Sequence, residues 1–201
     1  MNDKIQPLPL LYLARHGETA WSISGQHTGL TDLPLTERGE RNARRLGKRL
    51  EAENFDHVFT SPLQRAASTC ELSGFATVAS VDDDLVEWNY GDYEGITSAE
   101  IEQQQPGWEI FRDGCPGGES VADVVVRADR VINRLRALDG NILLFSHGHF
   151  ISFLAARWLD LDAAAGRCFM LNTTALSILG YHHGRHDPVI QLWNDCSHAG
   201  N

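Results

Sequence analysis

Short apolar runs recur along this chain, and each ends at polar residues or glycine. Runs of this kind are typical of buried strands, above all in parallel sheets. We expect strands at residues 10–14, 57–60, 76–80 and 141–146, and two late strands, a possible hairpin, at 175–180 and 189–193.

Helical spacing of apolar residues fills most of the intervals between these runs. Ser or Thr followed by Pro or an acidic residue is a helix-start signal, and it predicts N-caps at Thr36, Ser61, Thr97 and Ser120. A further helix at 150–159 is apolar on most of its circumference and is expected to be well buried. Residues 20–35, rich in Ser, Gly, Thr and Asp, are predicted to be a loop over the site, and 82–95 a structured loop.

The resulting order is strand, helix, strand, helix, strand, helices, strand, helix and two strands. This order predicts an α/β fold: a three-layer domain with a mixed, mainly parallel sheet flanked by helices. No internal repeat, low-complexity tract or linker interrupts it, so we expect residues 1–201 to form a single domain.

Charge and composition argue against several classes of binding partner. The formal net charge is −10, which argues against nucleic acid and against an anionic membrane surface. No apolar run is long enough to span a bilayer, and residues 1–7 lack the apolar core of a signal peptide, so a cytoplasmic location is expected. The four cysteines have no paired spacing, which indicates neither a zinc site nor a disulfide framework. The sequence gives no prediction of the oligomeric state.

Ionisable residues gather where the predicted strands end. Arg15 and His16 follow the first strand, Arg65 the second and His147 the fourth, while a loop supplies Glu87. Ligands bind beyond the carboxyl ends of parallel strands, so these side chains are expected to converge. Two arginines would repel a metal ion but suit a doubly charged oxyanion, which their guanidinium forks bind bidentately. Phosphoryl transfer fits this set, because an imidazole can be the nucleophile and a glutamate the general acid and base.

Four ordered blocks of sequence resemble the histidine phosphatase superfamily, which has the phosphoglycerate mutase-like fold. They follow a signature at 13–19 (Leu-Ala-Arg-His-Gly-Glu-Thr). The blocks are Thr28-Gly29 with 32–36 (Asp-Leu-Pro-Leu-Thr), 61–66 (Ser-Pro-Leu-Gln-Arg-Ala), Glu87 with Tyr90-Gly91, and 146–149 (Ser-His-Gly-His). The resemblance implies that His16 is the phosphorylated nucleophile and Glu87 the proton donor. It also implies that Arg15, Arg65 and His147 form the phosphate pocket, and that neither a metal nor a cofactor is used.

Within the superfamily, residues 21–29, 84–95 and 111–115 are similar to the sedoheptulose-1,7-bisphosphatase-like, broad-specificity phosphatase branch. Ser22 stands where the glycolytic mutases usually carry asparagine. Those mutases also have a longer, basic insertion that shields the phosphoenzyme from water. Here Arg112 is the only Lys or Arg between Trp88 and Ser120, against seven Asp and Glu. A phosphatase must admit water, so this short acidic segment favours a phosphatase acting on a small phosphorylated substrate, such as a sugar phosphate or bisphosphate.

Other functions stay open at this point. A phosphoglycerate mutase, a protein phosphohistidine phosphatase and a phosphoprotein-binding module are the alternatives. Seven residues of the matching blocks and of the loops around them are candidates for substrate contact: Ser22, Gln26, Thr28, Gly29, Tyr90, Arg112 and Gly148. His182, His183 and His186 resemble a metal-binding tract, but a solvent-facing hairpin turn explains them better.

Overall fold

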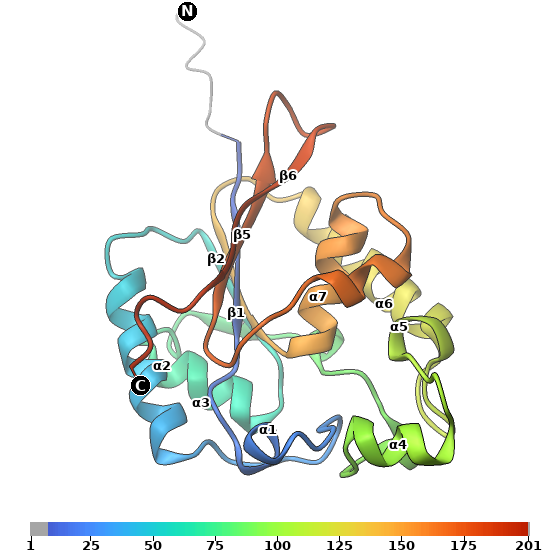
Figure 1. Cartoon of the computed structure of the whole chain (residues 1–201). Coiled ribbons are helices and arrows are strands. Elements are labelled where there is room, and N and C mark those ends of the chain that lie inside the picture. Colours follow the sequence, from blue (N-terminus) through green and yellow to red (C-terminus); the bar gives the residue numbers. More distant parts are fainter. Residues whose placement is uncertain (1–7, 201) are drawn as a thin grey trace, which may run out of the picture.

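A computed structural model describes residues 8–200 of the chain (Figure 1). Residues 1–7, on which the expectation of no signal peptide rests, lie outside the described part. Among the described helices, none is long and apolar enough to cross a membrane.

Six strands of the described chain form one mixed sheet, in the order β3-β2-β4-β1-β5-β6. β1 to β4 pair in parallel, whereas β5 runs antiparallel to both β1 and β6. The strands are β1 (Leu11–Arg15), β2 (His57–Thr60), β3 (Ala79–Val81), β4 (Ile142–Ser146), β5 (Leu176–Tyr181) and β6 (Pro188–Asp195). The predicted fold class is confirmed, although β3 starts three residues later than expected because a turn occupies 76–78.

Helices cover both faces of this sheet and make three layers (Figure 1). Leu11 and Leu13 of β1 pack in the core that contains residues of α6 (Val121–Arg136) and α7 (Gly148–Trp158). Tyr12 and Ala14 point to the other core, with residues of α2 (Glu37–Leu50) and α3 (Gln64–Leu72). Side chains of a strand alternate between its faces, so this one apolar run serves both cores.

Several short helices lie in the segments that connect the main strands and helices, where the apolar residues show little helical spacing. Residues 20–35 are not a loop throughout, because α1 (Ala20–Ser24) forms there; Thr19 and Ser22 close a reciprocal capping box. The other short elements are α4 (Ser98–Gln104), α5 (Ile110–Asp113) and the 3₁₀ turns η1 (Asp83–Leu85), η2 (Gly91–Tyr93) and η3 (Ala163–Cys168). In Figure 1, α1 and α4 lie near the carboxyl end of β1.

The start of α3 differs from its prediction. The helix begins at Gln64, and Leu63 is the N-cap with no side-chain bond. Asp32 instead accepts a hydrogen bond from the Gln64 amide, at 2.8 Å. A residue distant in sequence therefore satisfies the first amide of this helix, while the Ser61 hydroxyl accepts from the Leu63 amide at 3.3 Å.

Candidate active site

Most of the predicted ionisable residues lie at the carboxyl ends of three parallel strands. Arg15 ends β1 and His16 follows it, His147 follows β4, and Arg65 lies in the first turn of α3, beyond β2. Glu87 follows η1. We call these five residues the inner cluster. The rings of His16 and His147 lie 5.2 Å apart, centroid to centroid.

His16 is held as a neutral imidazole with one ring nitrogen free. Its Nδ1 lies 2.7 Å from the Gly17 carbonyl, which can only accept, so Nδ1 carries the proton. Nε2 therefore keeps its lone pair. The side chain is 4% exposed, and burial lowers the pKa of His16 well below its usual value, with Arg15 and Arg65 acting in the same direction. Its backbone is fixed by bonds to Ser146 (2.9 Å) and Thr174 (3.0 Å).

Arg65 and His147 form a buried pair behind His16. The Arg65 Nε donates to His147 Nδ1 at 3.1 Å, so the proton of this ring is on Nε2, which donates to Ser61 Oγ at 2.8 Å. Burial and the nearby Arg65 lower the pKa of His147 well below its usual value. The remaining Arg65 bonds go to carbonyls of the 28–31 segment, namely those of Thr28, Gly29 and Thr31.

Arg15 presents unused donors to the cavity beside His16. One Nη1 hydrogen goes to the Leu171 carbonyl, but the buried Nε has no partner within the described residues. Gly148 packs against the guanidinium: a Cβ at this position would lie 3.1 Å from both Nε and Cζ of Arg15. An unpartnered buried donor is costly, so this arrangement indicates a site for an anion.

Glu87 lies at the amino terminus of α7. Its Oε1 accepts from the amides of Trp88 (2.9 Å) and Phe150 (2.8 Å), and its Oε2 accepts from that of His149 (3.0 Å). This depends on α7 beginning at Gly148, two residues before the predicted start. The free amides of a helix end thus fix the carboxylate.

Arg127 of α6 holds the backbone that carries Glu87, a role that was not predicted from the sequence. It is 7% exposed, binds both Glu119 oxygens, and donates to the carbonyls of Asp84, Val86 and Glu87. A signal was present, because Arg127 lies on the apolar stripe of its helix, between Val124 and Ala128, where an unpaired charge would be costly.

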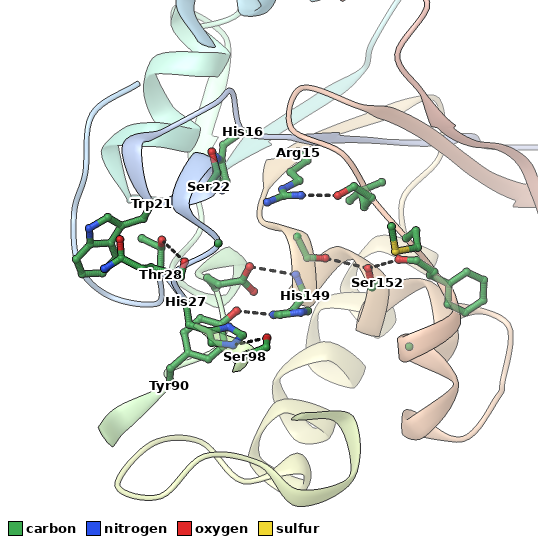
Figure 2. Close-up of a pocket in the computed structure, with 18 of the residues that line it drawn as sticks. Arg15, His16, Trp21, Ser22, His27, Thr28, Tyr90, Ser98, His149 and Ser152 are labelled. Atoms are coloured by element: carbon green, nitrogen blue, oxygen red, sulfur yellow. Dashed lines mark hydrogen bonds between the residues drawn. The ribbon is translucent and has the colours of Figure 1, made fainter. Parts of the chain in front are cut away.

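A cavity of about 350 Å³ opens beside Arg15, His16 and Glu87, and Figure 2 shows much of its lining. Five of the seven predicted substrate contacts line it: Ser22, Gln26, Thr28, Tyr90 and Gly148. Four of these already have local side-chain bonds. The Ser22 hydroxyl closes the α1 cap, and Gln26 donates to the Gly95 carbonyl at 2.6 Å. The Thr28 hydroxyl donates to the Gln26 carbonyl at 3.3 Å, and the Tyr90 hydroxyl bonds His149.

Gly29 and Arg112 do not line this cavity. The Gly29 amide donates to Glu94 at 2.8 Å and its carbonyl accepts from Arg65, so this residue joins the loop to its surroundings. Arg112 is exposed and its guanidinium binds the neighbouring Asp113 and the Gly107 carbonyl. The structure thus does not place these two where we expected them.

The cavity wall contains residues that the sequence did not single out as substrate contacts, among them His27, Phe111, His149 and Arg167. The Tyr90 hydroxyl lies 2.5 Å from His149 Nδ1, and the tilted His27 ring lies 4.7 Å from the Tyr90 ring and 5.9 Å from the His149 ring, centroid to centroid (Figure 2). Burial lowers the pKa of His27 and of His149 to about 4. Both rings are therefore neutral near pH 7 and form a polar but uncharged wall.

The histidine-rich turn is exposed and joins β5 to β6, as expected. Potential ligand atoms of His182, His183 and Asp187 lie within 4.8 Å of one another there. No residue of this turn lines the cavity beside His16.

Comparison with known proteins places the chain among phosphatases. Residues 11–196 match the model of the histidine phosphatase superfamily (branch 1). The chain is 42% identical to an acid phosphatase of Mycobacterium tuberculosis, with 87% of each chain covered. It is 32% identical to sedoheptulose 1,7-bisphosphatase of Saccharomyces cerevisiae (92% of each). It is also 32% identical to a probable phosphoglycerate mutase of Photorhabdus laumondii (86% of this chain, 85% of that protein).

A solved structure from Mycobacterium tuberculosis superposes with a TM-score of 0.88 at 40% identity, covering 92% of this chain and 97% of that one. The sheet order, the inner cluster and these matches agree with the resemblance found in the sequence. The chain belongs to branch 1 of the histidine phosphatase superfamily and is a phosphatase of that family.

Proposed function

We propose that this enzyme is a metal-independent phosphomonoester hydrolase that forms a phosphohistidine intermediate at His16. One observation carries the proposal: His16 Nε2 keeps its lone pair in a buried position, within the electrostatic influence of Arg15 and Arg65. A cation is disfavoured beside two guanidinium groups, whereas a phosphate dianion is favoured there.

In the first step, His16 Nε2 attacks the phosphorus of the bound ester. The Nε2–P bond forms, the P–O bond to the alcohol breaks, and Glu87 gives its proton to the leaving oxygen. Arg15, with its unused Nε–H, neutralises charge on the equatorial oxygens, and Arg65 adds its field from the buried side. The bond from Nδ1 to the Gly17 carbonyl supports the positive charge that develops on the ring.

In the second step, water attacks the phosphohistidine from the side that the alcohol has left. Glu87, now a carboxylate, takes a proton from this water, the N–P bond breaks, and inorganic phosphate and neutral His16 result. Three backbone amides hold Glu87 in place through both steps, so the same oxygen can donate and then accept.

The substrate class that we propose is a small phosphorylated metabolite, with a sugar phosphate or bisphosphate as the preferred candidate. A cavity of about 350 Å³ falls in the range of small-molecule sites. The relative named sedoheptulose 1,7-bisphosphatase supports a sugar bisphosphate. The short acidic segment between Trp88 and Ser120 favours hydrolysis over mutase chemistry.

Trapping the intermediate tests the proposal. We expect brief incubation with substrate, followed by alkaline quenching and peptide mass spectrometry, to show one added phosphoryl group on the peptide that contains His16. His16→Ala is expected to lose the adduct and at least about 10⁴-fold in kcat. His183→Ala, at an exposed histidine remote from the cavity, is the matched control and is expected to behave as the wild type.

Phosphorus NMR separates the alternatives. With 3-phosphoglycerate, a bisphosphate primer and sedoheptulose 1,7-bisphosphate present, growth of inorganic phosphate supports the hydrolase. Formation of 2-phosphoglycerate without free phosphate would instead favour the mutase. Undiminished turnover in His16→Ala would overturn the proposed nucleophile.

A further inference from the structure

A second depression, which we call the outer hollow, lies next to the cavity beside His16. This depression has a volume of about 510 Å³. The two share five lining residues and are therefore adjacent: His27, Ser98, Phe111, His149 and Arg167. The proposed mechanism uses only the inner part and assigns nothing to the outer hollow.

Arg167 belongs to η3, and its backbone is anchored on both sides. Just before it, Gly166 packs so closely on the Phe111 ring that a Cβ would lie 2.5 Å from Cε1. Just after it, the Phe169 carbonyl accepts from Ser152 at 2.7 Å, and the Leu171 carbonyl accepts from Arg15 (Figure 2). The segment that carries Arg167 is thus bonded to Arg15, which lines the cavity beside His16.

The charge of Arg167 is not used by the protein itself. Its guanidinium is exposed and has neither an ion pair nor a hydrogen bond among the described residues. Arg15 and Arg167 supply the basic side chains among the described residues that line the two depressions. The other charged groups there, apart from Glu87, are Glu102 and Glu109.

Both of these carboxylates are engaged locally. Glu102 accepts from the Gly107 amide at 3.0 Å with each oxygen, and Glu109 Oε1 caps α5 through the Phe111 amide at 3.1 Å. Arg167 therefore offers free donors where the neighbouring acids have partners. A guanidinium with unused N–H groups binds phosphate or carboxylate through two parallel bonds.

We propose that Arg167 binds a second anionic group of the substrate and so selects metabolites that carry a phosphate or carboxylate besides the phosphate that is cleaved. This inference rests on the proposed function, and it narrows the substrate class. Arg167 acts in binding and not in the chemical step, so its removal changes KM and leaves kcat largely as it was.

Matched substrate pairs test this selection. 3-Phosphoglycerate and glycerol 3-phosphate differ by a carboxylate, and fructose 1,6-bisphosphate and fructose 6-phosphate differ by a phosphate. In Arg167→Met we expect KM to rise about tenfold for the more anionic member of at least one pair, with little change for the other member. The pair that responds identifies the second group. Arg167→Lys is expected to recover part of the loss, and Arg167→Glu to increase it.

Arg112→Met is the matched control. Arg112 is also an exposed arginine, on α5, but its guanidinium is paired with Asp113 and it lines neither depression. We expect its KM values to equal those of the wild type. Equal KM changes for both members of both pairs in Arg167→Met, or no change in either pair, would overturn the role of Arg167 while leaving the hydrolase intact. If the wild type released no phosphate from any of the four esters, both this inference and the proposed substrate class would fail.

Discussion

The inner cluster and the outer hollow are built in opposite ways. In the inner cluster, most donors and acceptors are committed to the protein: Arg65 binds three carbonyls and a ring nitrogen, and Glu87 accepts from three amides. In the outer hollow, Arg167 has no protein partner among the described residues, and its segment is a 3₁₀ turn. Groups that are hydrogen-bonded to the protein are held in a fixed geometry for catalysis, whereas donors without a partner are available to recognise a substrate.

Glu87→Gln is expected to show the largest effect that this comparison predicts. The amide keeps the shape of the side chain but has no proton to give, and its NH₂ group would face one of the three backbone amides. We expect kcat/KM for an alkyl phosphate to fall about 10²- to 10⁴-fold. p-Nitrophenyl phosphate should lose far less, because p-nitrophenolate leaves without a proton.

A steady-state comparison of the two esters gives the result. Equal losses with both would mean that Glu87 only shapes the site. A loss confined to the alkyl ester would assign proton transfer to this carboxylate.

Arg127→Met tests whether catalysis also depends on the hydrogen bonds that hold the segment of Glu87 in place. Arg127 lines neither depression but holds the segment that ends at Glu87. Its loss would let the carboxylate shift, so we expect kcat to fall about tenfold with KM nearly unchanged. Arg127→Lys should recover only part of kcat, because an ammonium cannot reproduce the forked contacts with Glu119.

Counting active sites by the phosphohistidine burst corrects these rates for any unfolded fraction. A fall in burst amplitude with normal turnover per site would assign Arg127 to stability alone.

The same contrast explains which residues could be predicted from sequence. Arg15, His16 and His147 lie at the ends of parallel strands, whatever their side-chain partners are. The residue at which each apolar run ends was therefore enough to predict their positions. Arg112 was expected at the site from its position in a loop, but a local bond to the adjacent Asp113 decided its direction. Ser61 was interpreted as the N-cap of α3, because the sequence could not show that Asp32 would accept from the first helical amide or that His147 would bond the Ser61 hydroxyl.

Residues of the outer hollow gave no such signal. Arg167 lies among alanines and a glycine, and it reaches the cavity through the packing of Gly166 on Phe111 and the bonds of the Phe169 and Leu171 carbonyls. Contacts between segments this distant depend on the full packing of the chain, which hydrophobic periodicity does not encode.

The last prediction concerns stability, and not rate, at the boundary between the two regions, where His27 lines both depressions. Burial, followed by the neighbouring His149, lowers the pKa of His27 from 6.5 to about 4 in the folded protein. As the pH falls through 6.5, the unfolded chain takes up a proton at this position and the folded chain does not. The stability that the neutral ring provides is therefore complete above 6.5 and is lost as the pH falls toward 4.

Between about pH 7.5 and pH 5, this one group is expected to lower the free energy of unfolding by about 2 kcal/mol. Urea unfolding of His27→Gln at the two pH values should show a difference smaller than that of the wild type by this amount. The exposed His183→Gln should retain the full wild-type difference. If His27→Gln retained it as well, the folded and unfolded proteins would bind the proton at this position equally well, and at pH 5 the wall between the inner cluster and the outer hollow would carry a positive charge that could itself attract the second anion assigned to Arg167.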